Sequence, residues 1–196
     1  MKTYYIIYKP FGMLSQFSRE GEHRVLADLE FKFAKDVYPV GRLDADSEGL
    51  LLLTNDKELN HRLLNPVFKH ERTYLIQVEG EITDEACKKI EAGVSISVNG
   101  EKYLTEKCKA KVVAKPGDIP ERNPPVRFRK SIPTSWLQMT LTEGKNRQVR
   151  KMTAAVGFPT LRLIRISMED LTLGDMKPGE ARELKREIVF KLLKLR

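Results

Sequence analysis

The stretch that decides the fold is residues 37–54, which read VYPVGRLDADSEGLLLLT. It begins with four residues typical of a strand and ends with four consecutive leucines, Leu50–Leu53, before a threonine. A short, continuous apolar run of this kind predicts a strand that is buried on both faces. Residues 41–49, between the two ends, contain two glycines and four charged side chains, which predicts a loop. This stretch therefore predicts two strands joined by a charged loop that presents Asp44.

Outside this stretch, short strands and helices are interspersed along the chain. Strand patterns occupy residues 4–8, 73–79, 94–98, 103–104, 109–114, 135–142 and 161–167. Helix patterns occupy residues 23–29, 57–64 and 146–156, another helix opens at residues 83–86 and stops at Gly93, and a basic amphipathic segment covers 185–195. Asn99-Gly100 predicts a hairpin turn, because these residues adopt positive φ at little cost. The mixture of hairpins and helices predicts an α+β fold with a mainly antiparallel sheet.

The positive charge of the chain is concentrated in its last two-fifths. Residues 1–120 contain 18 basic and 19 acidic side chains, whereas residues 121–196 contain 17 basic and 8 acidic ones. Such a local excess indicates a polyanionic partner or, alternatively, a solvated basic surface without one. The long loop 115–133 combines basic residues with prolines and is followed by Trp136. This composition favours RNA strands or loops over sequence-specific DNA recognition.

Several classes of protein are disfavoured by the sequence. No apolar run approaches the roughly 18–20 residues that span a bilayer. Cys87 and Cys108 have neither metal-binding nor redox spacing, which favours a reduced, cytoplasmic protein. The three histidines form no metal-ligand pattern, and no phosphate-binding or dinucleotide-binding glycine motif is present.

The acidic loop that begins at Asp44 has three interpretations. It resembles the start of a calcium loop, but the twelfth position is Asn55 rather than glutamate, and strands rather than helices are expected on both sides. It is alternatively a surface turn whose acids cap or pair locally. In the third interpretation Asp44 is catalytic, because an aspartate held between two buried strands, with Arg42 nearby, stays ionised and available as nucleophile or base.

Four motifs in order resemble those of pseudouridine synthases of the ribosomal small-subunit type. The first two are Lys9-Pro10-Phe11-Gly12 and the segment from Gly41-Arg42-Leu43-Asp44 to Asn55. The others are Arg72-Thr73-Tyr74 and the basic run from Glu143 to Met152. The resemblance implies the pseudouridine synthase catalytic fold over residues 1–196, with a mainly antiparallel mixed sheet flanked by helices. It also implies two lobes that meet near residues 65–75, with a catalytic cleft between them.

The resemblance also implies an activity and a set of catalytic residues. The reaction isomerises a uridine in RNA to pseudouridine and needs no metal, nucleotide or redox cofactor, because isomerisation conserves atoms and electrons. Asp44 is implied to be the essential carboxylate, acting either on the sugar as nucleophile or as a base that leads to a glycal. Arg150 is implied to pair with Asp44, the alternative being a phosphate contact on a helix surface. Tyr74 is implied to pack on the target base, and Leu163, or else Ile164, to form an apolar pocket wall.

The remaining implied residues contact RNA. Arg42 is expected to touch the phosphate of the target strand or to fill the place of the flipped base. Lys9 is expected to contact a phosphate or to support the structure. Lys145 and Arg147 are candidates for phosphate contacts at a helix start. Three cations of the long loop are expected to bind phosphates as well: Arg127, Arg129 and Lys130.

Within the family, the chain is most similar to the short E-type members that act on large-subunit (23S) rRNA, which lack an N-terminal S4 RNA-binding domain. The expected partner is accordingly 23S rRNA or an assembly intermediate of the large subunit, with a monomer as the default and neither DNA nor a membrane involved. Two alternatives stay open. One is a non-catalytic, ribosome-associated RNA-binding protein on the same fold, and the other is a synthase that acts on small-subunit rRNA or tRNA.

Overall fold

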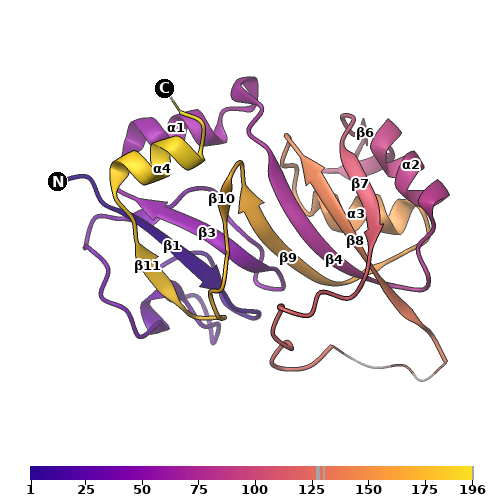
Figure 1. Cartoon of the computed structure of the whole chain (residues 1–196), viewed down its shortest axis with the longest axis horizontal. Helices are drawn as coiled ribbons and strands as arrows, with labels where there is room; N and C mark the ends of the chain where they lie inside the picture. The colour runs from indigo at the N-terminus through magenta and orange to yellow at the C-terminus, as the bar shows by residue number, and fades with distance from the viewer. Residues whose placement is uncertain (127–128, 130, 196) are drawn as a thin grey trace. The chain divides into compact units, whose positions relative to one another are not determined.

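The computed structural model describes residues 1–126, 129 and 131–195, whose helices and strands are labelled in Figure 1. The chain divides into two compact units. The first unit contains residues 1–70 together with residues from 164 onward, and the second contains residues 71–163. Strand β9 (Thr160–Met168) starts in the second unit and ends in the first. The first unit is therefore assembled from the two ends of the chain.

A mixed sheet forms the centre of the first unit. Besides the end of β9, its strands are β1 (Tyr4–Lys9), β2 (Tyr38–Pro39), β3 (Glu48–Thr54), β10 (Leu171–Thr172) and β11 (Ala181–Glu183). The order is β11–β1–β3–β9, with β2 on β3 and β10 on β9. Strand β1 is antiparallel to β3, from Tyr4 opposite Thr54 to Lys9 opposite Gly49. By contrast, β3 is parallel to β9 where Glu48 lies opposite Ile164.

The four leucines of β3 are completely buried, as the sequence predicts for a strand covered on both faces. Leu50, Leu51, Leu52 and Leu53 each have 0% exposure. Leu51 and Leu53 join a core cluster with Tyr5 and Ile7 of β1 and with buried residues of the 13–37 segment. The leucine run therefore lies in a central strand of this unit, between β1 and β9.

Four helical segments complete the first unit: the 3-10 turns η1 (Leu26–Asp28) and η2 (Pro66–Phe68), and the helices α1 (Lys57–Leu64) and α4 (Arg186–Leu192). Helix α1 has the predicted bounds, and Asp56 caps it by accepting hydrogen bonds from the backbone N–H groups of Glu58 and Leu59. The helix predicted over 23–29 is only a single 3-10 turn. It stops there because Leu29 returns to extended backbone.

The second unit contains a four-stranded arrangement in the order β9–β4–β8–β7 (Figure 1). The long pair is β4 (Arg72–Glu79) with β8 (Thr134–Leu141), and β7 (Lys109–Val113) pairs with the other edge of β8. Both pairs are antiparallel. Tyr74 lies opposite Met139 and Gln77 lies opposite Trp136. Tyr74 and Gln77 lie on opposite faces of the sheet, because adjacent side chains alternate along a strand.

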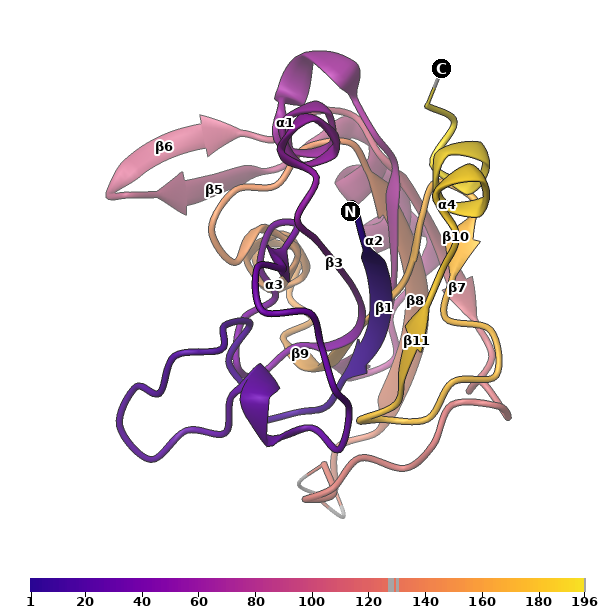
Figure 2. The ribbon, with the colours of Figure 1, turned by 90° about the vertical axis from the view of Figure 1, so that its left-hand side faces the viewer.

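Two helices and a separate hairpin accompany this sheet. The helices are α2 (Asp84–Ala92) and α3 (Gln148–Ala155), and the hairpin consists of β5 (Ser95–Val98) and β6 (Glu101–Leu104). Figure 2 shows the hairpin as its own two-stranded ribbon. Its turn is the predicted Asn99-Gly100, with φ of 53° and 86°. Helix α2 is capped by Thr83, whose side chain accepts a hydrogen bond from Ala86 N.

The α+β class and the mainly antiparallel sheet are confirmed. Three features are not predicted by the sequence pattern. The parallel pairing of β3 with β9 joins residues more than one hundred positions apart, and no local pattern encodes it. Strands β10 and β11 are two and three residues long, too short to show a period of two.

Candidate active site and RNA-binding residues

Asp44 lies in the first unit, in the turn between β2 and β3. Its backbone carbonyl accepts a hydrogen bond from Ser47 N at 3.0 Å, which closes the turn. Leu43 and Ser47, on either side, are 7% and 2% exposed, whereas Asp44 is half-buried. The buried neighbours anchor the turn, so the backbone around the carboxylate is held in place.

A second loop, residues 9–15, is hydrogen-bonded to this turn. Ser15 Oγ donates to Leu43 O at 2.8 Å and accepts from Leu43 N at 3.0 Å. Gly12 N donates to Ala45 O at 2.8 Å. The residues immediately before and after Asp44 are thus both tied to the 9–15 loop. Two motifs that are separated by some 30 residues in the sequence form one structural unit around the carboxylate.

Lys9 is the buried centre of this arrangement. It has 0% exposure, and its Nζ donates to the carbonyl oxygens of Met13 at 2.6 Å, Pro10 at 3.1 Å and Ala45 at 3.4 Å. Burial lowers the pKa of Lys9 to about 8, although the negative charges of Glu48, Asp46 and Asp44 partly oppose this shift. An enclosed ammonium with three carbonyl acceptors is not placed to meet a phosphate. Of the two roles expected for Lys9, the geometry therefore favours structural support over RNA contact.

Arg42 precedes this turn and is exposed. Its position, two residues before Asp44 and after Gly41, keeps the guanidinium at the surface of the same loop. Direct contact with RNA is sterically open to Arg42, in contrast to Lys9.

The calcium interpretation of the loop is not supported by the structure. Strands β2 and β3 flank the loop, not the two helices that a calcium-binding loop of this kind requires. Across the described residues, no group of three or more His, Cys, Asp or Glu side chains is arranged to hold a metal ion.

Tyr74, Leu163 and Arg150 lie in the second unit. Tyr74 is on β4 and Leu163 is on β9, with exposures of 8% and 6%. Ile164, the alternative wall residue, has 0% exposure, belongs to the first unit and lies opposite Glu48. Arg150 is half-buried in the first turn of α3. The pairing of Arg150 with Asp44 stays a prediction.

A buried carboxylate fixes the start of α3. Glu143 is 8% exposed and accepts hydrogen bonds from Tyr103 Oη at 2.6 Å, from Glu106 N at 2.8 Å and from the side-chain amide of Gln148. The same amide group of Gln148 accepts from Lys145 N at 2.8 Å through its Oε1. The hydrogen bond to Glu143 raises the pKa of Tyr103 to about 12, with burial adding to the effect. Glu143 therefore connects the β6 region, the 143–147 turn and α3.

This network presents the basic residues of the turn to solvent. Lys145 and Arg147 are both exposed, and Lys145 Nζ lies 4.9 Å from the centroid of the Tyr103 ring. Helix α3 begins at Gln148 rather than at Asn146 as predicted, because Arg147 has left-handed backbone with φ of 53°. Sequence reasoning does not identify Tyr103 or Gln148. The sequence does contain one signal for the network around them: between residues 122 and 151, Glu143 is the one acid among eight basic residues.

The long loop contains cations with different environments. Arg129 is half-exposed and pairs with Glu79 at 3.1 Å. Arg122 is turned onto the backbone, where it donates to the carbonyl oxygens of Pro124 at 2.8 Å and Pro125 at 3.0 Å. Arg122 thus shapes the loop rather than extending from it. Arg127 and Lys130 lie outside the described residues.

The geometry described so far is that of an aspartate on a braced turn in one unit, and of an aromatic residue, an arginine and a basic turn in the other. The model of the RNA pseudouridylate synthase family matches residues 3–155. The chain belongs to this family and is an RNA pseudouridine synthase, an isomerase that acts on RNA.

Individual relatives are similar over most of their length. The chain is 49% identical over 179 residues to ribosomal large subunit pseudouridine synthase E of Vibrio parahaemolyticus, covering 91% of this chain and 72% of the relative. It is 44% identical over 173 residues to the protein of the same name from Xanthomonas axonopodis pv. citri, covering 88% and 89%. A crystal structure of a pseudouridylate synthase matches with a TM-score of 0.78 at 25% identity, covering 98% of this chain and 74% of that one.

None of the helices in the described part of the chain is long and apolar enough to cross a membrane.

Proposed function

We propose that this enzyme isomerises one specific uridine of large-subunit (23S) rRNA, in free RNA or in an assembly intermediate, with Asp44 as the catalytic carboxylate. The observation that carries the proposal is the turn of Asp44, which Lys9, Gly12 and Ser15 hold by hydrogen bonds to its flanking residues. The choice of substrate is supported by relatives named large subunit pseudouridine synthase at 42–49% identity. We further propose that the protein acts as a monomer in the cytoplasm, without a membrane or DNA partner.

The reaction requires one ionised carboxylate and a target uracil that is held in position. The bond between uracil N1 and the ribose C1′ breaks, the uracil turns, and C5 bonds to C1′ while the C5 proton leaves and N1 gains one. Asp44 either attacks the sugar or removes a sugar proton to give a glycal. Because the target base must leave its stack to be reached, at a cost of a few kcal/mol, side chains that hold the flipped base lower this cost.

The further residues bind the target nucleotide or orient the carboxylate. Tyr74 packs on the target base, and Leu163 forms the apolar wall beside it. Arg150 pairs with Asp44 and keeps the carboxylate ionised and oriented. Arg42 contacts the target strand at its phosphate or takes the place of the flipped base.

The RNA backbone is held by cations of two segments. Lys145 and Arg147 contribute from the turn before α3, and the long loop contributes through Arg127, Arg129 and Lys130. To bind a phosphate, Arg129 must first separate from Glu79. Because this ion pair is solvent-accessible, its separation costs little free energy.

The experiment is a pseudouridine map of large-subunit rRNA after incubation with the wild-type protein, with Asp44→Asn and with Asp46→Asn. Asp46 is a matched control, since it is a half-buried acid of the same loop. We expect one new site with the wild type and with Asp46→Asn, and none with Asp44→Asn. A site that persists with Asp44→Asn would refute the role of Asp44. A new site that appears only on small-subunit rRNA or tRNA would refute the substrate.

A further inference from the structure

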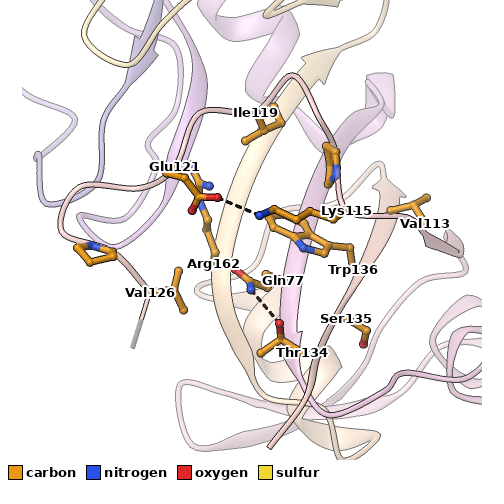
Figure 3. A pocket seen from close by; sticks show the side chains of 12 residues that line it. Gln77, Val113, Lys115, Ile119, Glu121, Val126, Thr134, Ser135, Trp136 and Arg162 are labelled. Carbon is orange, nitrogen blue, oxygen red and sulfur yellow. Dashed lines mark hydrogen bonds and ion pairs between the residues drawn. The ribbon is translucent and has the colours of Figure 1, made fainter. Parts of the chain in front are cut away.

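A cavity of about 340 Å³ lies within the second unit, between its sheet and residues 115–126 of the long loop (Figure 3). All four strands contribute to its sheet wall: Gln77 of β4, Val113 of β7, Arg162 of β9, and Thr134, Ser135 and Trp136 of β8. The catalytic roles proposed above use none of these residues.

The cavity and Tyr74 are on opposite faces of the sheet. Gln77 and Val113 both lie directly opposite Trp136 in the two strand pairs, so these three side chains share one face. Tyr74 is three positions from Gln77 along β4, and Leu163 is adjacent to Arg162 along β9. Both are therefore directed to the other face. The cavity is a separate site within this unit.

The walls combine the groups that bind an unpaired nucleotide. Trp136 provides an aromatic surface, and apolar side chains of the loop, including Ile119 and Val126, provide the opposite wall. Gln77 supplies an amide, and its Nε2 donates to Thr134 Oγ1 at 3.1 Å. Arg162 is a cation at only 3% exposure. Aromatic stacking together with Arg and amide groups is the usual composition of a pocket for a single RNA base and its phosphate.

The rim of the cavity favours an anion. Lys115 Nζ pairs with Glu121 Oε1 at 2.9 Å, and the two side chains are 69% and 82% exposed. Lys115 lowers the pKa of Glu121, and the charge of Arg162 contributes to the same shift. Two cations thus face one acid, and the exposed pair can separate at little cost.

We propose that this cavity is a second RNA subsite, which binds one unpaired nucleotide of the substrate outside the target uridine. The base lies against Trp136 and the apolar loop residues, and the phosphate lies toward Lys115 and Arg162. The volume is at the lower end of the roughly 300–1,000 Å³ typical of small-ligand pockets, which suits one nucleotide rather than a duplex or a folded peptide. The inference rests on the proposed function only in taking RNA as the natural ligand.

The test uses the fluorescence of Trp136, which is the only tryptophan of the chain. The wild-type protein is titrated with each of the four ribonucleoside 5′-monophosphates, and with ribose 5-phosphate as a ligand that lacks a base. Free N-acetyltryptophanamide corrects for collisional quenching. We expect saturable quenching by at least one nucleotide and none by ribose 5-phosphate. If no nucleotide gives saturable quenching up to 10 mM, roughly the weak limit for a useful site, the proposal is overturned.

Two rim variants should shift the nucleotide affinity in opposite directions. Lys115→Ala removes a cation near the phosphate and should raise Kd by up to about fivefold. Glu121→Gln removes the acid and should lower Kd by a similar factor. Lys109→Ala is the matched control, because Lys109 is an exposed lysine that also pairs with an acid, Glu71, in the same unit, and it should leave Kd unchanged. Shifts of the same sign in both rim variants would indicate a structural effect on the loop and overturn the proposal.

The same measurement with an rRNA substrate separates this inference from the proposed function. Quenching by rRNA, together with formation of pseudouridine, supports both. Pseudouridine formation while the fluorescence of Trp136 stays unchanged would refute the subsite alone. Nucleotide quenching in a protein that modifies no rRNA would support the subsite and refute the proposed substrate.

Discussion

At the scale of single residues, Lys9 shows how a motif can be recognised without its role being apparent. The sequence identifies Lys9-Pro10-Phe11-Gly12 by resemblance and leaves two roles open for the lysine. Its burial and its three carbonyl acceptors favour structural support. These contacts cannot be read from the sequence, since they depend on how the 9–15 loop folds against the turn of Asp44.

Replacing Lys9 should therefore impair turnover rather than RNA binding. Lys9→Met removes the ammonium that ties Ala45 to the 9–15 loop, and a small displacement of Asp44 should lower kcat by about 10- to 100-fold. The affinity for rRNA and its dependence on salt should stay unchanged. Single-turnover kinetics together with filter binding at several salt concentrations check this. If Lys9 contacted a phosphate, the salt slope would instead fall by about 0.7–0.9.

The same residue predicts a pH dependence of stability. Burial lowers the pKa of Lys9 to about 8 from its ordinary 10.5, so the unfolded chain binds this proton more tightly than the folded chain. The cost in folding free energy of burying the charged Lys9 is present in full below pH 8 and disappears as the pH rises toward 10.5. Urea unfolding of wild type and Lys9→Met should show a difference that moves in favour of the wild type by about 3 kcal/mol across this window. A constant difference would contradict the burial of a charged Lys9.

At the scale of elements, strand β3 requires a glycine where it meets β9. Gly49 has φ of +109°, and a Cβ at this position would lie 2.2 Å from the backbone oxygen of Arg165. Gly49 lies in the motif that contains Asp44, but its packing reason is a long-range contact with β9. The sequence therefore does not reveal why a glycine is required at this position, because the reason depends on where β9 lies.

Gly49→Ala should accordingly destabilise the protein by about 3 kcal/mol or more, because both the backbone conformation and the strand spacing must change. Gly117→Ala is the control, since its Cβ would meet no atom within 4 Å. Chemical unfolding of both variants measures the difference. Equal stability of the two variants would show that β9 does not approach Gly49 this closely.

The turn before α3 is the second element whose construction the sequence leaves undetermined. Glu143→Ala removes the acceptor of three hydrogen bonds, which should cost about 2–4 kcal/mol of stability and lower kcat through displacement of Arg150. Tyr103→Phe removes one of these bonds and should cost about 1 kcal/mol. Thermal unfolding and turnover of both variants test this order. A larger effect of Tyr103→Phe would show that Glu143 is not the centre of the network.

At the scale of the whole molecule, the sequence predicts the class of fold well and the path of the chain only partly. The buried leucines, the bounds of α1 and the Asn99-Gly100 turn are local patterns, and the structure has each of them as predicted. The return of the chain to the first unit at residue 164 has no local signal. The sequence also has no local signal that distinguishes Arg122, which is folded onto the loop backbone, from the exposed Lys145.

The distribution of charge predicts a strong salt dependence of RNA binding. Replacing Lys145 and Arg147 together should reduce the slope of log K against log salt by about 1.4 for two contacts to single-stranded RNA. Replacing Arg182 should have no effect on the slope, because Asp175 and Glu180 already pair with it. Replacing Arg127, Arg129 and Lys130 together should also flatten the slope with the fold intact. An unchanged slope in either set would remove those residues from the RNA interface.

The division of the chain also sets an order of events during protein synthesis. Residues 71–163 form a contiguous unit that is complete as soon as it leaves the ribosome. The unit of Asp44 must wait, because β9 and β11, which flank β3 and β1, are made last. We therefore expect the turn of Asp44 to mature only after β9 and β11 have been translated. A nascent chain that ends before β11 should therefore lack the mature turn of Asp44 and should not modify RNA.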